Sequence, residues 1–272
     1  MKYFYDGNQI RYTLVSTNGN SALNWLFIPG GAGADSSYYK SLTDHLHCSG
    51  NTWLIDFPGN GDHKIPLDNY DQWLSLFIPM VQSFTNPVVV GHSFGAMLPL
   101  LFKECESLLK GMVILNSAPC LWLEEAARFA QEHKLPDLTA EMKEFINHPC
   151  QETFNKALAA CMPYYFCPHH LEAGTQWLKS IPFPYKPAVW WLRKAHEISY
   201  TAQWIPKKVK TLIVGAELDA ITPFSLYEKD ARFMRSNIEK AFIQGAGHYP
   251  WLEKPQEVRE AFKKFEQSLM PS

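Results

Sequence analysis

A serine between two glycines stands directly after an apolar run and directly before an apolar helical pattern. The run is Val88-Val89-Val90, the pentapeptide is Gly91-His92-Ser93-Phe94-Gly95, and the helical pattern spans residues 96–102. A strand-to-helix turn of this kind is so tight that side chains at the two glycine positions would clash. The serine is then held in a strained backbone conformation with its hydroxyl clear of the sheet. The pattern predicts a nucleophile at Ser93, although the pentapeptide alone also fits a glycine-flanked turn with a solvated serine.

Short apolar segments alternate with helical patterns along most of the chain. Strands are expected at residues 10–17, 22–28, 52–57, 88–90, 112–115, 211–214 and 241–243, with a turn at 18–20 after the first. An amphipathic helix is expected over residues 69–84, with a kink at Pro79, and a closing helix near the C-terminus. Strands separated by helices indicate an α/β fold, in which helices cover both faces of a mostly parallel sheet.

Residues 121–204 break this alternation. They carry helical patterns and many aromatic residues but no convincing strand. We therefore expect a helical cap, or lid, at residues 121–204, lying over a core domain formed by residues 1–120 and 205–272. The proline-rich stretch 181–187 is expected to be a loop within the cap. The alternative is that residues 121–204 simply continue the α/β core.

A serine hydroxyl needs a base to take its proton, and the base needs a third group to fix its tautomer. His248 is the best-placed histidine, because it follows a strand in a glycine-containing loop, residues 244–251. Asp219 follows the strand at 211–214 and is the expected acid, with Glu217 as the alternate. An aspartate before Thr222-Pro223 also fits a turn or a helix start.

An oxyanion hole needs two backbone N–H donors. Phe94, directly after the serine, is expected to supply one. The second is expected from the loop Pro29-Gly30-Gly31-Ala32-Gly33, with Gly31 as first choice and Ala32 as second. This loop lacks a following Gly-Lys-Ser/Thr and a complete G-x-G-x-x-G, so it does not indicate a nucleotide site, and no cofactor is expected.

The composition argues against several other classes of protein. The 272 residues carry a net charge of -2 without a basic run, which disfavours nucleic acid as a partner. The N-terminus lacks a signal-peptide pattern, and no apolar stretch could span a bilayer. The six cysteines form no C-x-x-C pair, which indicates reduced thiols in a cytoplasmic protein. Cys161 and Cys167 lie near His169 and His170, but no second ligand pair follows, so no metal is expected.

Taken together, these motifs resemble the α/β-hydrolase superfamily over nearly the whole chain. The matching segments, in order, are residues 29–31, 56–61, 91–95, 215–219 with 222–223, and 247–248. The resemblance implies an eight-stranded, mostly parallel sheet with a helical lid after the sixth strand. It gives Asp56 a structural role, and it matches the chain order Ser93, Asp219, His248. The chain departs from the family pattern at Pro29-Gly30, where many members carry His-Gly, and at Ala96 and Pro99 after the pentapeptide.

These observations predict a serine hydrolase that cleaves a small ester, thioester or amide with an apolar moiety through an acyl-enzyme on Ser93. Within the family, carbon–carbon bond hydrolases and proline-iminopeptidase-like aminopeptidases remain alternatives. An aminopeptidase would need cap carboxylates for the substrate ammonium group, and the candidates are Glu124, Glu125, Glu172 and Glu197. A cofactor-free oxidoreductase of the perhydrolase or dioxygenase type, or a non-catalytic binding module, could share the scaffold.

Overall fold

Eight strands form one sheet at the centre of the molecule. The computed structural model describes residues 2–19, 21–63, 67 and 69–270. The strands are β1 (Lys2–Tyr5), β2 (Arg11–Asn18), β3 (Asn24–Ile28), β4 (Gly50–Asp56), β5 (Pro87–His92), β6 (Gly111–Leu115), β7 (Lys210–Ala216) and β8 (Ile238–Ile243). Their order is β1-β2-β4-β3-β5-β6-β7-β8, with β1 and β2 antiparallel to their neighbours and all other pairs parallel. The expected α/β fold with a mostly parallel sheet is confirmed.

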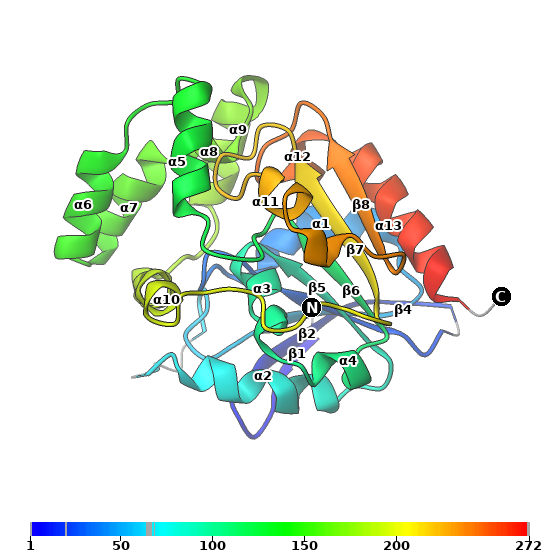
Figure 1. Ribbon diagram of the computed structural model, residues 1–272. Helices are drawn as coiled ribbons and strands as arrows, with labels where there is room; N and C mark the ends of the chain where they lie inside the picture. The colour runs from blue at the N-terminus through cyan, green and yellow to red at the C-terminus, as the bar shows by residue number, and fades with distance from the viewer. Residues whose placement is uncertain (1, 20, 64–66, 68, 271–272) are drawn as a thin grey trace.

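Helices cover both faces of this sheet (Figure 1). The core helices are α1 (Lys40–Leu46), α2 (Gln72–Gln82), α3 (Phe94–Met97), α4 (Cys105–Leu108), α11 (Ser225–Glu228), α12 (Pro250–Glu253) and α13 (Pro255–Leu269). One core cluster joins Trp73 of α2 to Leu26 of β3, and another joins Phe262 of α13 to the adjacent Phe27. Successive side chains of a strand point to opposite faces, so the continuous apolar run of β3 supplies both clusters.

The chain between β6 and β7 forms a separate group of helices, green to yellow in Figure 1. These are α5 (Leu123–Glu132), α6 (Thr139–Asn147), α7 (Gln151–Ala160), α8 (Met162–Tyr165), α9 (Leu171–Lys179) and α10 (Tyr185–Glu197). A β-bridge between Cys120 and Thr201 joins the two ends of the segment. The helices follow the sixth strand, as the resemblance implies. No helix in the described part of the chain is long and apolar enough to cross a membrane.

The structure differs from the sequence predictions at two prolines. The helix after the serine ends at Met97, and a 3-10 turn, Pro99–Leu101, replaces the rest of the expected pattern. Pro99 has no N–H to continue the helical ladder, which explains the break. The expected loop at 181–187 is wrong in its last part, because α10 already begins at Tyr185. Pro187 lies in the first turn, where an N–H has no intrahelical partner to lose.

Candidate active site

Ser93 lies at the turn between β5 and α3 with a positive backbone φ of 52° and a ψ of -123°. A side chain at Gly91 would place its Cβ 2.3 Å from the carbonyl oxygen of Gly95. A Cβ at Gly95 would lie 2.1 Å from the carbonyl oxygen of Ile28. Real Cβ atoms do not approach backbone this closely, so the predicted need for glycine at both positions is confirmed. The turn thus stores strain at the residue that presents the hydroxyl.

Asp219 and His248 come together at the same edge of the sheet. Asp219 follows β7, His248 follows β8, and each is 1% exposed. The Nδ1 atom of His248 lies 3.0 and 2.9 Å from the two carboxylate oxygens of Asp219. An ionised carboxylate only accepts hydrogen bonds, so Nδ1 carries the proton and Nε2 keeps a free lone pair. The pair therefore holds the imidazole in the tautomer that a general base requires.

Asp219 is kept ionised in spite of its burial. Burial raises the pKa of this carboxyl, but the interaction with His248 and the hydrogen bonds from Thr222 and Asn116 together outweigh burial and lower the pKa to about 2. The N–H groups of Ile221 and Thr222 also donate to Asp219 Oδ1, at 2.9 and 3.0 Å. The carboxylate of Asp219 therefore does two things: it binds the backbone of the turn that follows it, and it contacts His248.

The alternate acid has a different partner. The carboxylate of Glu217 accepts a hydrogen bond from the N–H of Gly245 at 2.8 Å. His248 is paired with Asp219 alone among the described carboxylates. The structure thus favours Asp219 over Glu217 as the partner of His248.

Asn116, which the sequence analysis missed, joins the serine turn to the acid. Its carbonyl accepts from the Ser93 N–H at 3.2 Å, and its Nδ2 donates to Asp219 Oδ2 at 2.9 Å. Its position directly after β6, at the carboxyl edge of the sheet, is the only sequence signal that could have indicated it. Among the described residues, no hydrogen bond links Ser93 Oγ to His248. Such bonds are often long in ligand-free enzymes and tighten with substrate.

The glycine loop after β3 presents an open N–H beside Ser93. Gly31 has φ 88°, and a Cβ there would lie 2.1 Å from Cζ of Phe183. Gly31 and Phe94 both line a cavity with Ser93, whereas Ala32 does not. Within the described residues, neither the Gly31 nor the Phe94 N–H has a protein acceptor. The geometry favours Gly31 over Ala32 as the second donor.

The loop is held from below by Asp56. Its carboxylate accepts from the Ser36 N–H at 2.8 Å and from Arg11 Nη2 at 2.9 Å. These contacts agree with the structural role that the resemblance implied.

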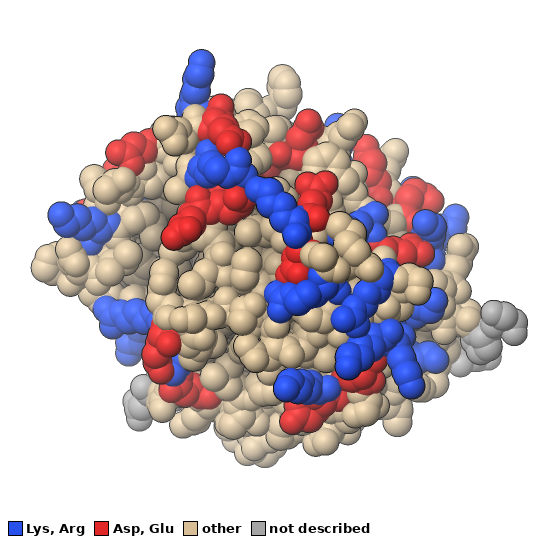
Figure 2. Space-filling view, viewed as in Figure 1, with Lys and Arg blue, Asp and Glu red and all other residues tan. Residues whose placement is uncertain are grey.

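A cavity of about 620 Å³ extends from Ser93 beneath α5, α6, α7 and α10. Its lining is mostly apolar and includes Met97, Leu123, Ala126, Met142, Phe145, Phe154, Ala157, Leu158 and Trp191. Asp137 is the one charged residue among the described lining residues, and its carboxylate accepts from the N–H and hydroxyl of Thr139. Figure 2 likewise shows an uncharged area between α5 and α10, with charged side chains around it. The cavity suits an apolar group.

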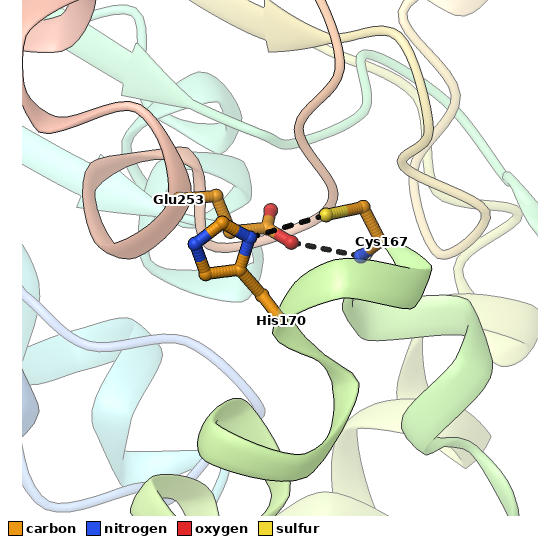
Figure 3. A group of neighbouring side chains, drawn as sticks. All are labelled: Cys167, His170 and Glu253. Atoms are coloured by element: carbon orange, nitrogen blue, oxygen red, sulfur yellow. Dashed lines mark hydrogen bonds between the residues drawn. The ribbon is translucent and has the colours of Figure 1, made fainter.

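Cys167, His170 and Glu253 are the described residues whose ligand atoms could together hold a metal ion, within 4.8 Å of one another. Figure 3 shows their contacts. Cys167 Sγ lies 3.3 Å from Nδ1 of His170, and Glu253 accepts from the N–H groups of Cys167 and Gly247. Burial raises the pKa of the Cys167 thiol, which disfavours the thiolate that a metal binds. Internal hydrogen bonds thus account for all three side chains.

The comparisons with known proteins agree with this architecture. The chain is similar to a thermophilic esterase from Thermogutta terrifontis, with 14% identity, complete coverage of both chains and a TM-score of 0.72. It is also similar to a proline iminopeptidase-related protein from Thermus thermophilus, with 20% identity, 99% and 98% coverage and a TM-score of 0.71. A proline iminopeptidase from Mycobacterium smegmatis follows at 18% identity, 98% and 97% coverage and a TM-score of 0.65. Comparison with curated proteins gave no match.

These solved structures share the fold of the chain. At such low sequence identities, the comparison supports the fold and nothing more specific. The sequence model of one family goes further, because it matches residues 25–261 and so includes the serine turn and both residues of the Asp219–His248 pair. The chain therefore belongs to the alpha/beta hydrolase family.

Proposed function

We propose that the protein is a serine hydrolase that cleaves a small ester, thioester or amide with an apolar acyl group. The observation that carries the proposal is a strained serine that lines an apolar cavity, on the sheet edge that holds a buried Asp219–His248 pair. In this proposal, residues 121–204 act as a cap over a core of residues 1–120 and 205–272.

The proposed reaction uses those atoms of the site that have no hydrogen-bond partner among the described residues. Ser93 Oγ attacks the substrate carbonyl carbon while Nε2 of His248 takes the hydroxyl proton. The N–H groups of Gly31 and Phe94 stabilise the oxyanion. The bond to the leaving group then breaks, and His248 returns the proton to that group. Water, deprotonated by His248, attacks the acyl carbon, and the acid leaves as Ser93 recovers its proton.

The cap carboxylates favour an acyl hydrolase over an aminopeptidase. None of Glu124, Glu125, Glu172 and Glu197 is among the described residues that line the cavity. Glu125 is paired with Arg128 and Lys229. Glu197 is paired with Lys194. The one cap carboxylate among the described lining residues, Asp137, is exposed and accepts hydrogen bonds from Thr139. An aminopeptidase would need a free carboxylate facing the substrate ammonium group, and the otherwise apolar lining offers poor solvation for that charge.

The proposal is tested by labelling the purified protein with a fluorophosphonate and locating the adduct by peptide mass spectrometry. We expect the adduct on Ser93, because an activated serine reacts with this probe through the same oxyanion-stabilised attack. His248→Ala should abolish labelling, whereas His196→Ala, at an exposed position of α10, should retain it. Folded protein that stays unlabelled would contradict the proposal, and oxygen- or peroxide-dependent turnover would favour the oxidoreductase alternative.

The cavity predicts a preference for longer acyl chains. Each methylene buried there contributes about 0.8 kcal/mol until the space is filled. Ala157 lines the cavity and is 3% exposed, so Ala157→Phe should occupy part of that space. We expect the ratio of kcat/KM for octanoyl over acetyl p-nitrophenyl esters to fall by about tenfold or more. Ala159→Phe, exposed on the same helix, is the matched control and should leave the ratio unchanged. An unaltered ratio in Ala157→Phe would show that the acyl group binds elsewhere.

A further inference from the structure

All four backbone polar groups of Gly247 and His248 have hydrogen-bond partners. The Gly247 N–H donates to Glu253, and the Gly247 carbonyl accepts from Asn116. The His248 N–H donates to the Tyr165 carbonyl, and the His248 carbonyl accepts from His92. Three of these partners are buried polar side chains. The main chain that carries the imidazole is therefore fixed on every side by groups outside the loop.

His92 makes the most informative of these contacts. Its Nε2 lies 2.9 Å from the carbonyl oxygen of His248, and a carbonyl only accepts, so Nε2 carries the ring proton. Nδ1 is then an acceptor, and it lies 3.0 Å from the hydroxyl of Tyr38, which donates to it. The same tyrosine oxygen accepts from the Gly30 N–H at 2.7 Å. One continuous hydrogen-bonded chain thus links the glycine loop to the His248 backbone.

The ring of His92 is unable to act as a base or to rearrange easily. It is 1% exposed, and both nitrogens have partners. Its ring centroid lies 4.9 Å from those of Tyr249 and Trp251. Burial, reinforced by the charge of His248, lowers the pKa of His92 well below its usual value and keeps the ring neutral. The neutral ring with its proton on Nε2 is the form that the hydrogen-bonded chain requires.

We propose that His92 is a positioning residue, which holds the backbone of His248 at a fixed place relative to the Gly30–Gly31 turn. The base and the oxyanion donor of the glycine loop then keep their places on either side of Ser93. The residue before the serine thus serves the reaction through its ring, although it is not among the described residues that line the cavity. This inference rests on the proposed function, because it assigns His92 a role through His248.

Two substitutions separate the two hydrogen bonds of the ring. His92→Gln carries an amide nitrogen near the place of Nε2, so it can still donate to the His248 carbonyl but loses the acceptor for Tyr38. His92→Asn is shorter: its amide oxygen can accept from Tyr38, but no donor reaches His248. The two variants are similar in polarity, but each keeps a different one of the two hydrogen bonds that the His92 ring makes.

We expect His92→Asn to lower kcat by about 10²-fold, since a misplacement of about 1 Å at a catalytic group costs this much. KM should change little, because the apolar cavity is untouched. His92→Gln keeps the bond to the His248 carbonyl but loses the link to Tyr38, so it should recover only part of kcat. Equal kcat values in the two variants, whether both low or both like the parent, would overturn the proposal.

Tyr38→Phe provides a second measurement should His92→Asn fail to fold. It keeps the ring of His92 and its packing but removes the hydroxyl that donates to Nδ1 and accepts from the Gly30 N–H, and so breaks the link to the glycine loop. A loss of kcat at unchanged KM supports the proposal, and an unchanged kcat overturns it. Fluorophosphonate labelling of the parent protein separates this inference from the proposed function. If the parent labels at Ser93 while these variants match it in rate, only the role of His92 is wrong.

Discussion

Ser93→Ala is expected to lower kcat on the best ester substrate by about 10⁴–10⁶-fold, the loss seen when a serine nucleophile is removed from a triad. The residual rate would come from the two proposed oxyanion donors and substrate binding. The variant should remain folded, because Ser93 Oγ makes no hydrogen bond among the described residues and the change removes a single atom. Steady-state kinetics with p-nitrophenyl esters measure the effect.

The protein must be free of host esterases, because their activity would make the loss of kcat appear smaller than it is. Parent and variant should be prepared in parallel, and circular dichroism and the melting temperature should match. Activity that survives within about 100-fold of the parent would contradict nucleophilic catalysis by Ser93. Catalysis would then proceed without an acyl-enzyme on Ser93, and that part of the proposed function would be wrong.

The parts of the molecule that the sequence predicted well are those where geometry restricts residue type. The turn at Ser93 admits only glycine at positions 91 and 95, because any Cβ there would meet backbone atoms. Residues directly after parallel strands share one edge of the sheet, which is why Asp219 and His248 could be paired from their positions alone. Buried apolar runs such as those of β5 and β6 can likewise be predicted as strands from the residue pattern alone.

The parts that could not be predicted depend on contacts between distant segments. The turn at 18–20 suggests neighbouring strands, yet β4 lies between β2 and β3 in the sheet, and residue 20 is outside the described residues. The edge strand β1 was missed in the residue pattern because Tyr3, Phe4 and Tyr5 are all exposed and show no alternation. Asn116 and Glu253 belong to no motif, and only the folded chain shows which backbone groups they bind.

The helical segment between β6 and β7 shows the same division. Aromatic content and helical pattern indicated helices in residues 121–204, but neither could tell which side chains face inward. Of the six cysteines, Cys161 lines the cavity and Cys167 contacts His170. The contact of Cys167 is local, three residues along the chain, whereas the inward position of Cys161 depends on packing between helices, which periodicity within one helix does not encode.

Asp219→Asn is expected to lower kcat by about 10⁴-fold, the cost of presenting the wrong histidine tautomer to a serine. Oδ1 accepts from the N–H groups of Ile221 and Thr222, so the asparagine oxygen should take that place. Its amide nitrogen would then face Nδ1 of His248 and donate to it. The ring proton would move to Nε2, where the serine proton must be accepted.

Glu217→Gln is the matched control, because it removes the same charge two residues away, where the carboxylate binds Gly245 rather than His248. It should keep kcat within a few-fold of the parent. Because the pKa of Asp219 is about 2, this carboxylate stays ionised throughout any practical assay, and the acidic limb of the activity profile must report another group. The asparagine side chain does not ionise, so raising the pH should not restore a charge at residue 219 in Asp219→Asn. If Glu217→Gln loses more activity than Asp219→Asn, the acid has been misassigned, whereas equal, small losses would mean that His248 needs no anionic partner.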